Sequence, residues 1–214
     1  MSKQAALIQQ HDVSQSNVEH DSNNVSQNAA DDKIPGNIAV WILIYAELTE
    51  FGLFFAIFLI AKAANPIIFT EGPTRLHTSS GLINTLVLLT SSFFVARAIH
   101  AIKQDKLKAC QHWLWLTLFA GAAYLGTKTW EYSINADNGI DGTTNLFFTI
   151  YYYLTFNHLL HVMMGMCTIA WVLARSYIFP YSKDDHEGLE SAACYWHMVD
   201  LVWIMIFPLL YVLR

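Results

Sequence analysis

Five long apolar blocks dominate this chain of 214 residues and constrain its fold more than any other feature. They cover residues 38–60, 80–102, 112–132, 146–176 and 191–213. A bilayer core of about 30 Å is crossed by roughly 20 apolar residues in a helix, so each block is long enough to span it. Because the blocks are continuously apolar, they favour helices over the alternating strands of a membrane barrel. The sequence predicts an all-α, polytopic membrane protein, a bundle of five transmembrane helices within residues 38–214.

The first 37 residues have a different composition. They are rich in Ser, Asn and Gln and contain no aromatic side chain. Such a segment buries too little apolar surface to offset the entropy of ordering, so we expect residues 1–37 to form a disordered polar tail. The segment has no basic start followed by an apolar run, and this excludes a secretory signal peptide. The formal net charge of −5 and the absence of a basic stripe exclude nucleic acid as a partner.

The distribution of Lys and Arg between the loops predicts the orientation. The side that holds the N-terminus also holds Lys3, Lys33, Arg97, Lys103, Lys106, Lys108, Arg175 and Lys183. The opposite side holds Lys62, Arg75 and Arg214, with Lys128 near it. Since basic residues collect on the cytoplasmic side, we expect the N-terminus to be cytoplasmic and the C-terminus external.

Large aromatic side chains lie near the ends of the blocks. They are Trp41, Trp113, Trp115, Tyr132 and Tyr211. This placement is typical of an aromatic belt at the membrane interface, and we assign these residues no other role.

Several ionisable side chains interrupt the apolar blocks. A charge facing lipid at mid-bilayer costs about 2.5–3.5 kcal/mol or more, so each should face protein, a partner or a lipid headgroup. Four pairs are spaced three residues apart, which places both members on one helix face. The pairs are Glu47 with Glu50, Lys128 with Glu131, His158 with His161, and His197 with Asp200.

The first carboxyl pair and the first histidine pair each allow two interpretations. Glu47 and Glu50 could accept protons or contact lipid, or they could be neutral carboxyls bonded to another helix; at least one is expected to be protonated. His158 and His161 could share a metal ion or form packing hydrogen bonds between helices. We prefer the packing role for the histidines, because the Glu-x-x-His signature of di-iron bundles is absent.

The remaining two pairs are expected to be structural. Lys128 and Glu131 predict an internal ion pair near the external end of the third block. His197 and Asp200 predict a hydrogen-bonded pair within the fifth block, which would lower the cost of burying both groups.

Five motifs in chain order resemble the cytochrome c oxidase subunit III family. The last block reads Tyr195-Trp196-His197-Met198-Val199-Asp200 after Glu190, which is similar to the family's final-helix signature. The other matches are Asn157 to Gly165, Ile83 to Ser92, Trp130-Glu131-Tyr132 and Ala46-Glu47-Leu48. The resemblance covers about residues 38 to 214. Members of the mitochondrial type have seven helices, so this chain resembles the five-helix form found among bacterial oxidases.

The resemblance implies a non-catalytic subunit III in the aerobic electron transport chain of a bacterial inner (cell) membrane. Such subunits carry no haem, copper or other intrinsic cofactor. The haem and copper belong to the catalytic subunit I, whose stability and proton uptake the subunit supports, and phospholipid is expected to bind. Glu47 corresponds to the family's buried carboxyl, whereas Glu50 stands where an apolar residue is expected. The packing and lipid-contact residues would be Glu131, His158, His161, Glu190, His197 and Asp200.

Alternative functions remain open at this point. The segments Val199 to Tyr211 and Thr90 to Phe93 look closest to the branch that accompanies nitric oxide reductase, which would make the chain an accessory subunit in denitrification. A stand-alone membrane metalloenzyme would instead use the intramembrane carboxylates and histidines as ligands. A transporter is disfavoured, because the sequence shows no internal repeat and its Gly and Pro residues lie mostly in loops.

Overall fold

The computed structural model describes residues 37–179, 181 and 186–213, and every regular element within them is helical. The elements are α2 (Ile38–Ala64), α3 (Pro66–Glu71), η1 (Gly72–Arg75), α4 (Thr78–Ile102), α5 (Leu107–Asp137), α6 (Leu146–Ile178), α7 (Glu187–Phe207) and η2 (Pro208–Val212). They belong to one compact unit, Gly36–Arg214. The all-α prediction is confirmed for these residues. The predicted disorder of the N-terminal tail lies outside them, apart from Asn37.

Local sequence signals explain where the helices begin and end. The Asn37 side chain accepts a hydrogen bond from the backbone N–H of Ala39 at 2.9 Å and caps α2. Asn145 caps α6 in the same way, with Phe148 as the donor at 3.0 Å. Such caps satisfy backbone donors that the first turn leaves unpaired. Pro66 starts α3, where its missing N–H costs nothing.

Four helices are long and apolar enough to cross a membrane. They are Ile38–Ala64, Thr78–Ile102, Leu146–Ile178 and Glu187–Val212. The chain is therefore a multi-pass membrane protein. Helix α5 spans 31 residues, but its polar side chains, Lys128 and Glu131 among them, lower its hydropathy. Helix α5 also extends beyond both ends of the predicted apolar block at 112–132, because polar residues can continue the backbone hydrogen bonding of a helix.

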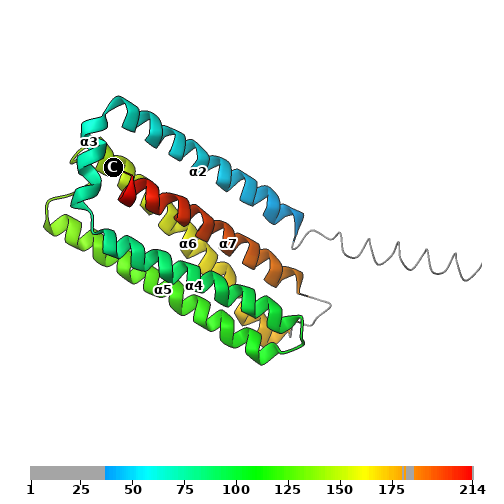
Figure 1. Cartoon of the computed structure of the whole chain (residues 1–214). Coiled ribbons are helices and arrows are strands. Elements are labelled where there is room, and N and C mark those ends of the chain that lie inside the picture. The colour runs from blue at the N-terminus through cyan, green and yellow to red at the C-terminus, as the bar shows by residue number, and fades with distance from the viewer. Residues whose placement is uncertain (1–36, 180, 182–185, 214) are drawn as a thin grey trace, which may run out of the picture. The chain divides into compact units, whose positions relative to one another are not determined.

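The helices pack as neighbours within this unit (Figure 1). Helices α4 and α5 lie side by side, and α7 contacts both α4 and α6. Helix α2 lies along α7 and α6 but buries only Ile44, Phe51 and Phe58. Most of the α2 surface is therefore left uncovered by the other helices that the structure describes.

Glycines allow α5 and α6 to approach α7 closely. A Cβ atom at Gly165 would lie 2.9 Å from the Trp196 ring, and one at Gly121 would lie 3.1 Å from the same ring and 2.9 Å from the sulfur of Met166 on α6. The fully buried Trp196 indole donates to the Ser91 hydroxyl at 3.0 Å. Small residues at helix contacts are how membrane helices gain close packing.

Candidate functional site in the polar helix contacts

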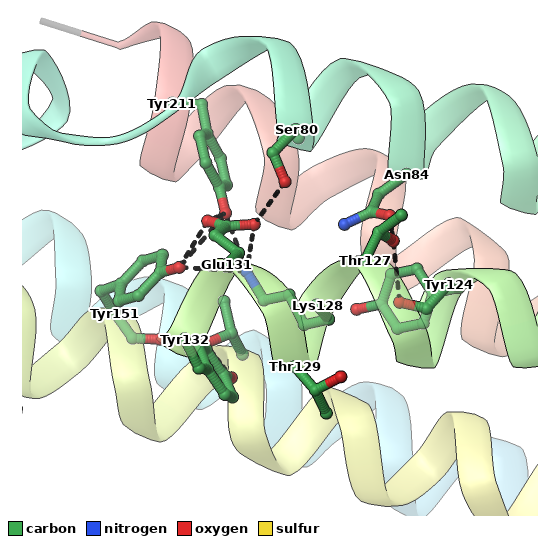
Figure 2. A network of polar contacts seen from close by, with 12 residues as sticks. Ser80, Asn84, Tyr124, Thr127, Lys128, Thr129, Glu131, Tyr132, Tyr151 and Tyr211 are labelled. Carbon is green, nitrogen blue, oxygen red and sulfur yellow. Dashed lines mark hydrogen bonds and ion pairs between the residues drawn. The ribbon is translucent and has the colours of Figure 1, made fainter. Parts of the chain in front are cut away.

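A fully buried ion pair lies at the centre of a polar network (Figure 2). The Lys128 ammonium lies 3.4 Å from Oε2 of Glu131, one turn along α5, and both side chains have no exposed surface. The Glu131 carboxylate accepts bonds from Tyr151 at 2.7 Å, Tyr211 at 2.6 Å and Ser80 at 2.8 Å. Lys128 also donates to the Tyr211 hydroxyl at 2.8 Å and the Tyr151 hydroxyl at 3.1 Å. The predicted ion pair is confirmed.

This network connects α5 with α4, α6 and η2. The sequence motifs did not reveal the three hydroxyl partners, because no pattern pairs residues so far apart in the chain. The interfacial role expected for Tyr211 is wrong, since its side chain is 1% exposed and its hydroxyl lies against the ion pair. A satisfied buried pair of this kind specifies which helices meet, and leaving either charge alone would be costly.

A second polar contact joins α2 to α6 through three successive side-chain pairs, which we call the α2–α6 seam. The seam consists of Glu47 with His161, Glu50 with Asn157, and Phe54 with Tyr153. Oε2 of Glu47 lies 2.5 Å from Nε2 of His161, and the Asn157 amide donates to Oε1 of Glu50 at 2.8 Å. The rings of Phe54 and Tyr153 meet edge to face with centroids 5.2 Å apart.

The two carboxyls of the seam occupy different environments. The Glu47 side chain is 13% exposed, and the imidazole that it meets is held from behind by a bond between Nδ1 of His161 and the Asn157 carbonyl oxygen. A proton can be shared between Glu47 and His161 at this distance. The Glu50 side chain is exposed, because the other described helices cover α2 on one side only, and it is bonded to Asn157 of another helix, as one of its two interpretations expects.

His158 points away from the seam into the bundle and has no exposed surface. Its ring stacks on Trp203 with centroids 5.2 Å apart and meets Tyr124 edge-on at 5.8 Å. Neither ring nitrogen has a hydrogen-bond partner among the residues that the structure describes. The two histidines of the pair therefore serve different helix contacts.

The pair expected between His197 and Asp200 is wrong. Nδ1 of His197 lies 2.6 Å from the Ser92 hydroxyl of α4 instead. Asp200 is buried beside Ser92, but in the described part of the chain no group stands in hydrogen-bond geometry to its oxygens. The Ser92 hydroxyl of α4 takes the place of Asp200 as the partner of the His197 imidazole. Residue spacing along α7 cannot predict a partner on another helix.

Glu190 lies at the other end of α7, where the helices meet the basic loops. Its Oε1 is 3.1 Å from the ammonium of Lys103 and 3.3 Å from Nε2 of His186. The Lys103 side chain is half exposed, so this is a surface contact of small energetic value. It ties the start of α7 to the end of α4.

The ionisable groups do not converge on a single point. Among the described residues, no three His, Cys, Asp or Glu side chains are close enough together to hold a metal ion. Glu131, Glu47 and His197 each lie in a separate contact with different partners. The arrangement is that of helix-to-helix bonding rather than a shared ligand set.

An apolar groove of about 250 Å³ lies between α2, α6 and α7. It is lined by Val40, Leu43, Met164, Thr168, Trp171, Val172, Gly188, Ser191, Ala192 and Tyr195. The guanidinium of Arg175 lies 5.7 Å from the centroid of the Trp171 ring, so a cation stands next to one end of the groove. An apolar groove with a positive group at its mouth can accept a chain with an anionic head.

Comparison with known proteins gives consistent relatives. The family model described as cytochrome c oxidase subunit III matches residues 36–213. Cytochrome c oxidase subunit 3 of Thermostichus vulcanus is 34% identical over 177 residues, which is 82% of this chain and 86% of that protein. The Synechocystis protein of the same name is 35% identical over 175 residues, 81% of this chain and 74% of its own. A probable quinol oxidase subunit 3 of Staphylococcus saprophyticus is 26% identical over 194 residues, 91% of this chain and 96% of its own.

The match extends over the whole of the described helical unit, including the motifs in α4, α5, α6 and α7. The resemblance found in the sequence is thereby confirmed. The chain belongs to the cytochrome c oxidase subunit III family.

Proposed function

We propose that this chain is the non-catalytic subunit III of a haem-copper respiratory oxidase in a bacterial inner membrane. The observation that carries the proposal is the family match over residues 36–213. The use of the intramembrane charges in separate helix contacts supports it further, because such groups stabilise a bundle without forming a redox centre. Haem and copper then belong to a catalytic subunit I, which is the expected partner.

The same proposal includes five crossings with a cytoplasmic N-terminus. The contacts between α4 and α5 support a membrane-spanning α5. Ser80 bonds to Glu131 near one end of these helices, and Arg97 lies over the Trp113 ring near the other, with 5.6 Å to the centroid. Helix α4 is long and apolar enough to span the membrane. Because α5 lies beside α4 over that length, α5 reaches both membrane surfaces as well. The Lys and Arg bias sets the direction.

Phospholipid is the proposed ligand of the groove between α2, α6 and α7. Acyl chains suit its apolar walls, and a phosphate headgroup suits the position of Arg175 beside Trp171. The Glu47–His161 contact is the proposed site of support for proton uptake, since it brings a carboxyl and an imidazole within hydrogen-bond distance close to the bundle surface.

A pull-down of the tagged chain from native membranes in mild detergent tests the function. We expect a haem-bearing catalytic subunit in the eluate, identified by its absorption spectrum and by mass spectrometry. A partner that reduces nitric oxide would replace the oxidase assignment with the denitrification alternative. Recovery of the chain alone with a stoichiometric transition metal would reject the accessory role.

A further inference from the structure

Glu50 lies near the middle of a membrane-spanning helix. Twelve residues of α2 precede it and fourteen follow it. At about 1.5 Å per residue it lies roughly 18 Å from the start of the helix. In a hydrocarbon core of about 30 Å this is close to the midplane. A lipid-facing helix surface at that depth lies within the hydrocarbon.

The described residues satisfy only part of the hydrogen-bonding capacity of this carboxyl. The Asn157 amide donates to Oε1 at 2.8 Å, and it is the one donor to Glu50 in the described structure. His161 is engaged by Glu47, and the neighbouring Thr49 hydroxyl donates to the Tyr45 carbonyl of its own helix at 2.7 Å. The Glu50 side chain is exposed, so its remaining acceptor sites face outward.

The surface around Glu50 is apolar, aromatic and uncovered. Leu53 is 61% exposed, Tyr153 is 63% exposed and Phe156 is 54% exposed. We call this surface, consisting of Glu50, Leu53, Tyr153 and Phe156, the Glu50 face. Its exposed leucine, tyrosine and phenylalanine side chains give another helix an apolar surface for van der Waals packing.

Acyl chains and a second copy of the chain both fit this face poorly. Acyl chains offer no hydrogen-bond donor, and a polar group left without a partner in hydrocarbon is strongly disfavoured. A symmetric dimer formed through this face would bring two Glu50 carboxyls together, and like groups at one site repel. A helix that carries a hydrogen-bond donor suits both the carboxyl and the apolar surroundings.

We propose that the Glu50 face is the docking surface for a transmembrane helix of the catalytic partner subunit, and that this helix donates a hydrogen bond to Glu50. The inference rests on the proposed function, because it takes the partner from there. It goes beyond that function by assigning the contact to one face and one side chain.

Two substitutions at Glu50 test the hydrogen bond. A bond to a charged group contributes about 1.5–3 kcal/mol, so Glu50→Leu should lower recovery of the haem-bearing subunit about tenfold or more in mild detergent. Glu50→Gln keeps an acceptor and should retain most of that recovery. Thr90→Leu is the matched control: it removes an exposed polar group on α4 whose hydroxyl is already bonded to the Leu86 carbonyl, and it should change nothing. Equal recovery with Glu50→Leu, at an unchanged membrane level of the chain, overturns the proposal.

Photo-crosslinking in native membranes tests the Glu50 face while the Glu50 side chain is kept. A benzoylphenylalanine at Leu53 or at Tyr153 should give an adduct with the catalytic subunit, identified by mass spectrometry. The same group at Leu86 of α4 or Phe119 of α5, which are 56% and 68% exposed on the opposite pair of helices, should give none. Adducts with lipid alone, or with a second copy of the chain, overturn the proposal. If no haem-bearing subunit copurifies with the unmodified chain, the proposed function itself fails, whereas copurification without adducts rejects only the Glu50 face.

Discussion

The Lys128–Glu131 pair places two opposite charges in a fully buried position, and each charge depends on the other. Its hydroxyl partners come from α4, α6 and η2, so the network has to be complete before either group is compensated. The spacing of three residues in the sequence predicts the pair itself. The hydroxyl partners could not be predicted, because their positions are set by the packing of helices that lie far apart in the chain.

Removing one charge of this pair is expected to be worse than removing both. Lys128→Met should lower the free energy of unfolding by about 3–5 kcal/mol, because Glu131 would be left as an uncompensated buried charge. The double variant Lys128→Met with Glu131→Leu should recover most of that loss. Thermal unfolding of the detergent-solubilised variants measures both effects. Equal losses for the single and double variants would contradict a coupled pair.

The Glu47–His161 contact is expected to affect turnover rather than assembly. Glu47→Gln keeps the shape of the side chain but removes its titratable proton, so the complex should assemble normally and lose activity sooner during turnover. Oxygen consumption by the purified complex, followed until it inactivates, measures this. Glu71→Gln, an exposed carboxyl at the end of α3, is the control. If both variants behave like the unmodified complex, Glu47 has no proton role.

At the scale of helices, close approach of α6 to α7 depends on the missing side chain at Gly165. The apolar residues of the sequence predict the helix there, but they do not indicate which of its faces packs against Trp196. The structure shows this face, because a Cβ atom at Gly165 would lie 2.9 Å from the Trp196 ring, whereas a Cβ atom at Gly126 would meet nothing within 4 Å.

This contrast predicts opposite effects for two identical substitutions. Gly165→Ala should destabilise the chain by about 1–3 kcal/mol, as overpacking of a filled contact does. Gly126→Ala should stabilise α5 by as much as about 1 kcal/mol, because alanine favours the helix more than glycine does. Thermal unfolding of the two variants under one detergent condition compares them. A loss of stability at Gly126 equal to that at Gly165 would mean that the contact with Trp196 is not the cause.

At the scale of the whole molecule, the number of crossings depends on α5. Its hydropathy alone does not mark it as a span, while its pairing with α4 supports one. If α5 crosses, the loop between α4 and α5 and the loop between α5 and α6 lie on opposite sides of the membrane. If it does not, both loops lie on one side.

Cysteine accessibility distinguishes these arrangements. After the native cysteines at 110, 167 and 194 are replaced by serine, Gln104→Cys and Asn138→Cys each place one thiol in a loop. We expect a membrane-impermeant maleimide on intact cells to label Asn138→Cys, and to label Gln104→Cys only after the membrane is opened. The same result at both positions, labelling of both or of neither on intact cells, would contradict α5 as a crossing helix.

The sequence by itself determined the helical class, the approximate helix positions and the Lys128–Glu131 pair, since each of these depends on residues close together in the chain. It also determined the family, because the order of short motifs along the chain can be read without knowing how they pack. Only the tertiary structure decided the partners of the buried polar groups. His197 lies against Ser92 rather than Asp200, and the Tyr211 hydroxyl is bonded to the buried ion pair. The Glu47 carboxyl contacts His161, whereas the Glu50 side chain is exposed on the bundle surface. The reason is physical: in a membrane bundle the choice of partner depends on which helix faces meet at the same depth, and apolar blocks specify that a helix spans without specifying how it is rotated.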